Sequence, residues 1–393
     1  MLNALGTIYY LSKNYLKNDV QFAEKGKFEI LFYLIKIGDG IFIVDKKIFR
    51  SNKKIMNENF KLNLPHRPRR LRRNPARLAM CAETSLSPSD LIQPLFVVEG
   101  RNKCEKIDSM PGISRLSIDR LLKKCETLLA LGVPAVALFP QINPRLKNND
   151  ADEAVNPDSV QNKAIRAVKK RFPELQVLAD IALDPYTSHG HDGILNKDGD
   201  WILNDETVEV LVAMSAVAAQ SGADFIAPSD MMDGRVGAIR EALDELGFEN
   251  TAIMAYTAKY ASAFYGPFRE AVGTLKKGKS GVDKSGYQLN PANTREALRE
   301  ASLDEKEGAD IIMVKPAGHY LDIVSKLRQA TSLPIAAYQV SGEYSMVCAA
   351  AQNGWIDFDK IRDESLISIK RAGADMILTY FAESFAQSFK SKK

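Results

Sequence analysis

Two lysines stand directly after short apolar runs that are typical of buried strands. Lys259 follows "TAIMAYTA", and Lys315 follows "IIMV" immediately before Pro316. A single lysine at such a place is usually a surface residue with its charged end in water. Burial and repulsion between neighbouring ammonium groups, however, both lower the pKa of a lysine. A partly neutral lysine attacks carbonyl carbons and forms Schiff bases, so the pair indicates covalent chemistry on two carbonyl substrates held at once.

Other polar side chains occupy the same place at the ends of further apolar runs. In chain order they are Asp180, Asp184, Ser229, Asp230, Ser341 and Tyr380. Every strand has to end somewhere polar, so none of these residues is informative alone. If the runs are parallel strands of one barrel, their carboxyl ends share one face of the molecule. These groups would then surround both lysines.

The apolar runs predict an α/β fold, a (β/α)8 TIM barrel. From about residue 91 they alternate with longer amphipathic stretches such as "NDETVEVLVAMSAVAAQSG", which is the pattern of repeated βα units. The runs are "LIQPLFVVE", "AVALFP", "QVLADIAL", "FIAPSD", "TAIMAYTA", "IIMVKP", "PIAAYQV" and "MILTYF", and eight strands close such a barrel. A similar motif recurs as "SGADFI", "EGADII" and "AGADMI". It supports repeated βα units, because glycine ends a helix before the next strand begins.

The segment after Lys259, "YASAFYGPFREAVGTLKKGKSGVDKSGYQLN", has the composition of a lid. It is rich in glycine, serine and aromatic residues, and such loops close over substrates and exclude water. Arg269 and Lys284 lie within it and are suited to pair with substrate carboxylates. We interpret its "TLKKGK" run as a solvated surface loop.

The chain resembles the porphobilinogen synthase family, also called delta-aminolevulinic acid dehydratase, from about residue 65 to the C-terminus. The motifs that carry the resemblance are "PSDMMDGR" (Pro228–Arg235), "KYASAFYGPFR" (Lys259–Arg269), "MVKPA" (Met313–Ala317), "YQVSGEY" (Tyr338–Tyr344) and "SIKRAGAD" (Ser368–Asp375). The resemblance implies that two 5-aminolevulinate molecules condense to porphobilinogen, with loss of two waters, in tetrapyrrole and heme biosynthesis. The alternative is a single-substrate class I Schiff-base aldolase on the same barrel, which would leave Lys259 without a role.

The resemblance also implies catalytic roles. Lys315 matches the Schiff-base lysine for the substrate that becomes the propionate side of the product. Lys259 matches the second Schiff-base lysine, for the acetate side. Asp180, Ser229 and Asp230 fall in the active-site wall of the family.

Substrate-binding roles follow from the same resemblance. Arg269 and Lys284 match the lid residues that bind one substrate carboxylate. Ser341 and Tyr380 match the residues that bind the other, with Gln288 nearby.

The stretch "DIALDPYTSHGHDG" raises the question of a metal. Zinc-dependent members of the family carry three cysteines here, and this chain has Ala182, Asp184 and Asp192 at the matching positions. A methyl group cannot ligate, and carboxylate oxygens suit magnesium or no tightly held ion. We therefore expect no zinc in the active site. His189 and His191 are interpreted as groups that order the loop.

Glu300, in "REALREAS", matches the carboxylate of a regulatory magnesium site in family members that have one. That site lies away from the chemistry and near subunit contacts. An ordinary acid on a surface helix is the alternative. The resemblance thus implies magnesium as an allosteric cofactor.

The N-terminal part differs from the barrel. Residues 1–58 contain no recognisable motif and are expected to be a leader of unknown role, with Met56 as a candidate natural start. Residues 59–90 are expected to form an arm, and residues 91–393 the catalytic barrel. The arginine-rich run at 66–77 alone fits a nucleic-acid-binding tail. The resemblance implies instead an arm that wraps a neighbouring subunit in a homo-octamer, which we favour because a catalytic barrel follows.

Composition supports a cytoplasmic enzyme. The net charge of +4 is too small to indicate a nucleic-acid or membrane partner. The four cysteines are scattered without a CxxC pair, which favours a reducing compartment. The most apolar early stretch, "FEILFYLIKIGDGIFIV", is too short and too interrupted by charge to span a membrane, and no signal or transit peptide is evident.

Overall fold

The computed structural model describes residues 9–11, 32–37, 40–45, 62–274 and 282–391. The chain divides into two compact units, Met1–Cys81 and Ala82–Lys393. In the first, strands β1 (Tyr9–Leu11), β2 (Phe32–Ile37) and β3 (Gly40–Asp45) form an antiparallel sheet in the order β1-β3-β2. The expected start at Met56 lies outside the described residues.

The described part of the predicted arm contains three short helical segments, the 3-10 helix η3 (Pro68–Arg72), the α-helix α2 (Pro75–Met80) and the 3-10 helix η4 (Pro88–Asp90). The side chain of Asn74 accepts a hydrogen bond from the backbone N–H of Arg77 at 2.9 Å, which caps the N-terminus of α2. Neither η3 nor α2 has a buried residue, whereas Pro88 of η4 is buried. The described residues 62–81 therefore form no apolar core of their own.

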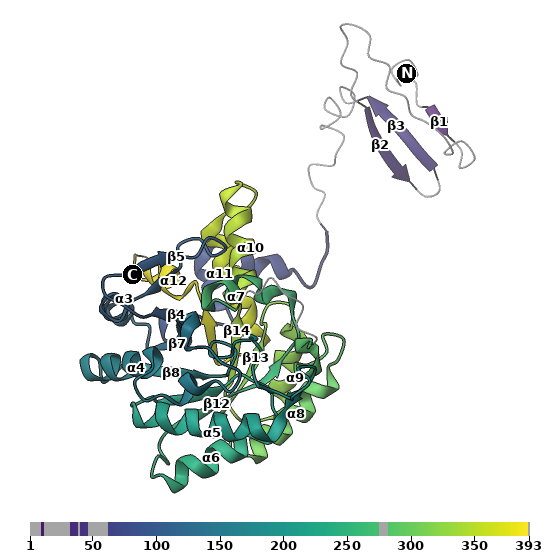
Figure 1. Ribbon diagram of the computed structural model, residues 1–393. Coiled ribbons are helices and arrows are strands. Elements are labelled where there is room, and N and C mark those ends of the chain that lie inside the picture. The colour runs from purple at the N-terminus through teal and green to yellow at the C-terminus, as the bar shows by residue number, and fades with distance from the viewer. Residues whose placement is uncertain (1–8, 12–31, 38–39, 46–61, 275–281, 392–393) are drawn as a thin grey trace, which may run out of the picture. The chain divides into compact units, whose positions relative to one another are not determined.

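The second unit is a closed barrel, which confirms the predicted fold (Figure 1). Its parallel strands follow the order β15-β14-β13-β12-β11-β8-β7-β4, and pairing of β15 with β4 closes the ring. They are β4 (Leu91–Val98), β7 (Ala135–Gln141), β8 (Gln176–Ile181), β11 (Phe225–Pro228), β12 (Ala252–Lys259), β13 (Ile311–Lys315), β14 (Ile335–Gln339) and β15 (Met376–Thr379). Each coincides with one of the apolar runs, because a parallel strand buried on both faces is apolar almost throughout.

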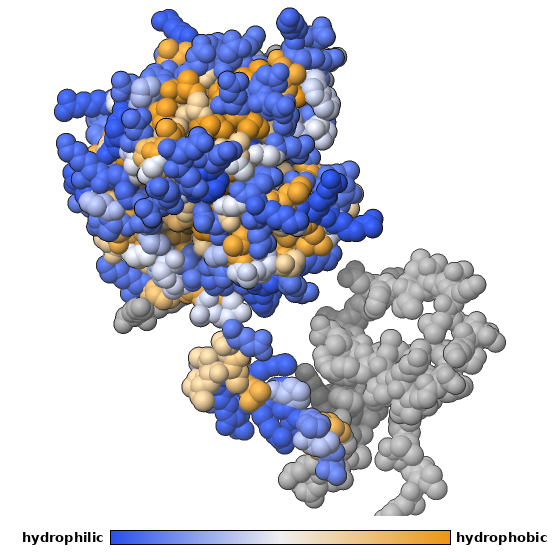
Figure 2. All heavy atoms as spheres, turned by 90° about the horizontal axis from the view of Figure 1, so that it is seen from below, coloured by the Kyte–Doolittle hydropathy of each residue, from blue (hydrophilic) through white to orange (hydrophobic). Residues whose placement is uncertain are grey.

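Helices surround the barrel and follow its strands. They are α3 (Ile118–Ala130), α4 (Val160–Arg171), α5 (Asn204–Gln220), α6 (Arg235–Glu245), α7 (Gly266–Val272), α8 (Arg295–Lys306), α9 (Leu321–Ala330), α10 (Ser341–Gln352), α11 (Phe358–Ala372) and α12 (Ala382–Ser391). Short strands β5 (Cys104–Lys106), β6 (Ser114–Leu116), β9 (Ile194–Leu195) and β10 (Ile202–Leu203) lie in the connections. The face of the molecule in Figure 2 is a mixture of hydrophilic and hydrophobic residues.

Two features of the barrel position the predicted site. Gly222 and Gly308, from the recurring motif, both have φ of +98°. They end their helices in the left-handed region that favours glycine. In the ladder between β12 and β13, Lys259 is the direct partner of Lys315, beyond an irregularity between Ala255 and Ala258. The two lysines thus end neighbouring strands at the same level.

The predicted lid runs from residue 260 to residue 290. Its described parts comprise the 3-10 helix η7 (Ala263–Tyr265), helix α7 and the 3-10 helix η8 (Lys284–Gly286). Most of the "TLKKGK" run lies outside the described residues, so its interpretation as a solvated loop stays a prediction.

Candidate active site

The carboxyl ends of the strands enclose a small cavity of about 20 Å³. Its lining residues are Asp180, Asp184, Asp192, Ser229, Lys259, Tyr265, Phe268, Arg269, Lys284, Gln288 and Lys315. Both lysines therefore face the same space, as their strand positions predict. The lid contributes Arg269, Lys284 and Gln288 to the same cavity.

Lys315 is buried in an aromatic cage. Its Nζ lies 4.6 Å from the ring centre of Tyr338, 5.0 Å from Tyr256, and 5.2 Å from both Tyr265 and Phe268. Burial, followed by the nearby Lys259 ammonium, lowers the pKa of Lys315 to about 7. Lys315 is therefore partly neutral at neutral pH, as a nucleophilic lysine has to be.

The pKa of Lys259 differs from the lowered value expected for two neighbouring lysines. Its Nζ lies 3.2 Å from Oδ1 of Asp192 and donates a hydrogen bond to the carbonyl oxygen of Ser229. Burial alone would lower the pKa of Lys259, but the carboxylates of Asp192, Asp184 and Asp180 outweigh it and raise that pKa. The prediction that crowding lowers the pKa of both lysines holds for Lys315 and is wrong for Lys259, because Asp192 supplies a counter-charge.

Asp192 is the centre of this charge network. Its Oδ2 accepts hydrogen bonds from Nζ of Lys284 at 2.7 Å and from the hydroxyl of Tyr287 at 2.6 Å. Burial would raise the pKa of Asp192, but Lys259 and Lys284 together hold it well below the usual range. Asp192 is thus a fixed negative charge between two lysines.

The other two aspartates of the stretch "DIALDPYTSHGHDG", Asp180 and Asp184, have raised rather than lowered pKa values. Burial is the main cause that raises the pKa of Asp180 to about 7, and its Oδ1 has no hydrogen-bond partner among the described residues. Burial and the charge of Asp192 also raise the pKa of Asp184, whose Oδ2 lies 3.9 Å from Nζ of Lys284. Three neighbouring aspartates therefore have unequal acidities, an arrangement that suits proton transfer.

Some predicted substrate-binding residues lie beside the cavity rather than in its lining. Oγ of Ser341 accepts a hydrogen bond from the backbone N–H of Phe268 at 3.0 Å, which ties α10 to the lid helix α7. The hydroxyl of Tyr380 is 2.9 Å from that of Tyr338 in the aromatic cage. Arg269, by contrast, lines the cavity directly.

Comparisons with known proteins agree with this geometry. The family model described as "Delta-aminolevulinic acid dehydratase" matches residues 65–388. A delta-aminolevulinic acid dehydratase from Bradyrhizobium diazoefficiens is 53% identical over 331 residues, which cover 84% of this chain and 93% of the relative. The chain belongs to the delta-aminolevulinic acid dehydratase family.

Further relatives extend the comparison to plants and to a solved structure. A chloroplastic delta-aminolevulinic acid dehydratase from the moss Physcomitrium patens is 55% identical and covers 83% of this chain and 74% of its own length. A crystal structure of the enzyme from Toxoplasma gondii ME49, in complex with the reaction product porphobilinogen, has a TM-score of 0.83. It is 47% identical and covers 85% of this chain and 94% of that chain.

In this member of the delta-aminolevulinic acid dehydratase family, Asp230 does not line the cavity. Its carboxylate lies 3.6 Å from Nε of the buried Arg235 and accepts a hydrogen bond from the backbone N–H of Met232 at 2.7 Å. Arg235 also lies 3.6 Å from Asp304 on α8. Asp230, predicted as an active-site residue, is therefore turned toward a buried ion-pair network behind the site.

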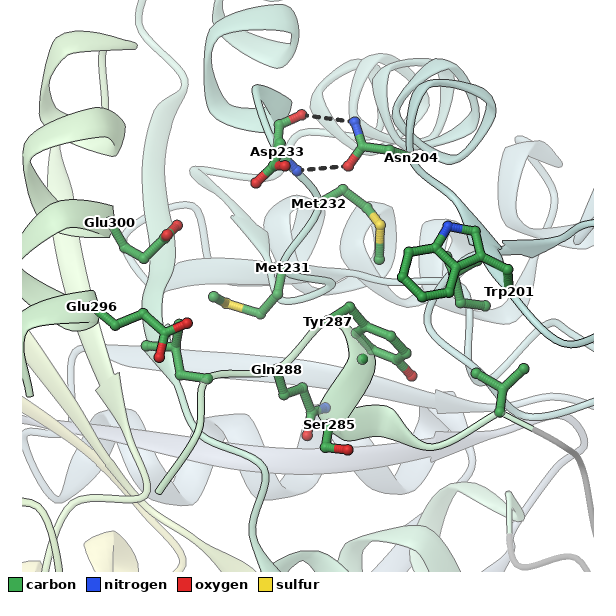
Figure 3. Close-up of a pocket in the computed structure, with 14 residues that line it drawn as sticks. Trp201, Asn204, Met231, Met232, Asp233, Ser285, Tyr287, Gln288, Glu296 and Glu300 are labelled. Atoms are coloured by element: carbon green, nitrogen blue, oxygen red, sulfur yellow. Dashed lines mark hydrogen bonds between the residues drawn. The ribbon is translucent and has the colours of Figure 1, made fainter. Parts of the chain in front are cut away.

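A second cavity, of about 300 Å³, lies beside the first. Figure 3 shows Glu300 and Glu296 reaching into it from α8, with Asp233 across from them. Burial, followed by the neighbouring Asp304, raises the pKa of Glu300. Gln288 lines both cavities and forms part of the wall between them.

Sequence reasoning missed the aromatic cage and the role of Tyr287. The signal was present in the dense aromatic content of "KYASAFYGPFR" and "YQVSGEY", but the presence of a ring does not indicate which group its face meets. His191 is interpreted from the sequence as a group that orders its loop. Its Nδ1 lies 3.3 Å from the hydroxyl of Tyr287.

Proposed function

We propose that this chain condenses two molecules of 5-aminolevulinate to porphobilinogen, with loss of two waters, as a lyase of tetrapyrrole biosynthesis. The observation that carries the proposal is the register pair of Lys259 and Lys315 in one cavity, with opposite pKa shifts. The names of the relatives and the product bound in the Toxoplasma gondii enzyme support it. A single-substrate aldolase would need only one of the lysines.

In this proposal Lys315 forms the first Schiff base, with the substrate that becomes the propionate side. Its lowered pKa supplies the neutral amine that attacks the carbonyl carbon. The four rings around its Nζ present their faces to a cation, and such contacts stabilise positive charge. They would therefore favour the protonated Schiff base once it has formed.

Lys259 forms the second Schiff base in this proposal, after it has lost a proton. Asp192 holds Lys259 as an ammonium in the free enzyme, so the second lysine is kept unreactive until the first substrate is bound. Asp180, with a pKa of about 7, is the group best matched to accept and return protons near neutral pH. Ser229 fixes Lys259 through its backbone carbonyl.

The lid residues bind one substrate carboxylate. Arg269 and Lys284 reach the cavity from the lid, with Gln288 beside them. In the free chain Lys284 is paired with Asp192, so a substrate carboxylate has to compete for this lysine. A cavity of about 20 Å³ has room for about one water molecule, so some of its lining groups have to move apart when 5-aminolevulinate binds.

Ser341 and Tyr380 bind the carboxylate of the other substrate in this proposal. Ser341 lies at the start of α10, where the helix N-terminus favours an anion. Both hydroxyls now contact neighbouring groups of the cage and lid. Exchanging these contacts for the carboxylate would couple substrate binding to movement of α7.

A regulatory magnesium ion is proposed at Glu300. Glu300, Glu296 and Asp233 line the second cavity, but no three acids of the described residues are close enough together to hold an ion by themselves. Glu300 would therefore bind magnesium together with waters, which this ion usually keeps. A bound cation would relieve the crowding of acids that raises the pKa of Glu300. Asp184 and Asp192 fit a metal poorly, because Lys259 and Lys284 already supply their positive charge.

The absence of zinc from the active site is proposed on the donor chemistry. Ala182, Asp184 and Asp192 provide no thiolate, the soft ligand that holds zinc well. Chelation with a zinc-selective reagent is expected to leave turnover intact.

Assembly as a homo-octamer through the arm of residues 59–90 is also a proposal. Leu71, Leu78 and Met80 are 56%, 52% and 85% exposed, and a row of exposed apolar residues favours burial against another subunit. The arm would serve this contact rather than bind nucleic acid.

A cytoplasmic location is proposed from the four free cysteines. Among the described residues no helix is long and apolar enough to cross a membrane.

The deciding experiment is turnover of 5-aminolevulinate followed by borohydride trapping and peptide mapping. Formation of porphobilinogen, with adducts on the peptides of Lys315 and Lys259, is expected. An adduct on Lys315 alone, without porphobilinogen, would favour the aldolase alternative.

A further inference from the structure

The hydroxyl of Tyr256, one of the rings of the cage around Lys315, has no hydrogen-bond partner among the described residues. Tyr256 lies on β12 and is fully buried. Buried hydroxyls normally find a partner, because leaving one unpaired costs the whole desolvation free energy of the group. An orphaned hydroxyl at an active site therefore calls for a functional explanation.

The other two tyrosines of the cage do not share this property. Tyr338 pairs its hydroxyl with that of Tyr380 at 2.9 Å, and Tyr265 donates to the carbonyl oxygen of Tyr260 at 2.8 Å. Both hydroxyls are thus held by the protein. Of the three tyrosines whose rings face Lys315, Tyr256 is the one whose hydroxyl the described part of the chain leaves unpaired.

Tyr256 does not line the catalytic cavity itself but belongs to the aromatic cage around the lysine that opens into it. The ring of Tyr256 lies 5.0 Å from Nζ of Lys315. The carboxylate of Asp180, which also has an unpartnered buried oxygen, is close enough to act on the hydroxyl electrostatically. Burial and Asp180 raise the pKa of Tyr256 well above its ordinary value, so the hydroxyl keeps its proton and acts as a donor.

We propose that the hydroxyl of Tyr256 donates a hydrogen bond to the oxygen of the ketone that Lys315 attacks. The inference rests on the proposed Schiff-base role of Lys315. As Nζ bonds to the carbonyl carbon, the electrons of the C=O π bond move to oxygen, and a fixed donor stabilises the charge that develops there. Tyr256 is a catalytic residue in this step and never loses its own proton.

The step balances without a further reactant. The two protons of the neutral lysine amine move to the former carbonyl oxygen, one after addition and one as the C–O bond breaks. The oxygen leaves as water, and the nitrogen lone pair forms the C=N bond of a neutral imine. Asp180, the proposed proton carrier, supplies the proton that converts this imine to the protonated Schiff base. Tyr256 donates to the same oxygen throughout and is released when the water departs.

Tyr256→Phe tests this role because it removes only the hydroxyl. Borohydride trapping with 5-aminolevulinate, quenched at short times, is expected to show adduct formation at Lys315 slowed by about 10²–10³-fold, the usual effect of losing one such donor. The Tm is expected to be unchanged or higher, because no hydrogen bond within the protein is lost. A role in stability alone would instead lower the Tm and leave the trapping rate unaltered.

Tyr344→Phe is the matched control. The Tyr344 hydroxyl donates to the carbonyl oxygen of Pro111 at 2.6 Å, so this variant should lower the Tm and leave adduct formation unchanged. If Tyr256→Phe does not fold, 3-fluorotyrosine at position 256 keeps the hydroxyl and makes it a stronger donor. It should trap at least as fast as the natural protein, and slower trapping would overturn the proposal.

Different results would overturn the Schiff-base role of Lys315 and the hydrogen-bonding role of Tyr256. If the unaltered chain gives no adduct at Lys315, the Schiff-base role of that lysine is wrong, and the role of Tyr256 falls with it. If the unaltered chain and Tyr256→Phe form the adduct at the same rate, the Schiff-base role stands and the Tyr256 inference alone is overturned.

Discussion

Lys315 and Lys259 end neighbouring strands as direct register partners, yet their side chains lie in opposite surroundings. Lys315 is enclosed by aromatic rings and has a lowered pKa, whereas Lys259 lies against Asp192 and has a raised one. Backbone position alone would make the two equivalent. The difference shows that side chains from other segments decide which lysine is neutral, and so which can react first.

Removing each lysine in turn is the strongest test of this difference. Lys315→Ala should abolish turnover and all borohydride-trappable adduct, because Lys259 is held as an ammonium by Asp192. Lys259→Ala should also abolish turnover but should still give an adduct on the peptide of Lys315. Lys326→Ala, on the exposed face of α9, is the control and should behave as the unaltered chain does. Near-normal rates in either active-site variant would defeat the two-lysine mechanism.

Asp192→Asn should bring the pKa of Lys259 closer to that of Lys315. An amide provides no counter-charge, so the pKa of Lys259 should fall. Turnover should drop by roughly 10²–10³-fold, the usual effect of removing one fixed electrostatic group from an active site. The pH dependence of amine labelling at Lys259 measures the first effect, and a steady-state assay measures the second. Asp224→Asn is the control, because Asp224 pairs with Lys169 elsewhere in the barrel. An unchanged labelling profile in Asp192→Asn would show that Asp192 does not control Lys259.

Much of this arrangement could be predicted from sequence, because it depends on the strands. The eight apolar runs locate the barrel, and the polar residues at the ends of β8, β11, β12 and β13 line the cavity. The pKa of Lys259 could not be predicted, because Asp192 lies 67 positions away and on a different loop. The cage combines rings from β12, the lid and β14, which only the closed barrel brings together. Asp230 follows Ser229 directly, but its side chain turns to Arg235, and a strand-end pattern does not indicate that direction.

The pH dependence of the first covalent step gives a further test of the contrast. The pKa of Lys315 is lowered to about 7, so below that pH the lysine is an ammonium and cannot attack. Trapping at Lys315 should therefore fall roughly tenfold for each unit below about pH 7 and level off above it. Lys259→Gln removes the like charge, so the pKa of Lys315 should rise and the fall should begin at higher pH. A profile that is flat from pH 5.5 to 8.5 would contradict a lowered pKa.

The smallest effect is expected in the second cavity, where a change should alter regulation and leave the lysines intact. Glu300→Gln keeps the shape of the side chain but removes the charge that would hold magnesium, and the proposed cation lies outside the catalytic cavity. We expect basal turnover within about a factor of two of normal, with magnesium stimulation lost. Calorimetry with magnesium alone should show weaker binding, a readout that does not depend on activity. Glu305→Gln is the control, because Glu305 lies on the same helix but accepts a hydrogen bond from Thr331 and does not line this cavity. If Glu300→Gln still binds magnesium and responds to it as before, the ion acts elsewhere. If its basal rate collapses instead, the second cavity is coupled to the lysines more directly than the wall formed by Gln288 implies.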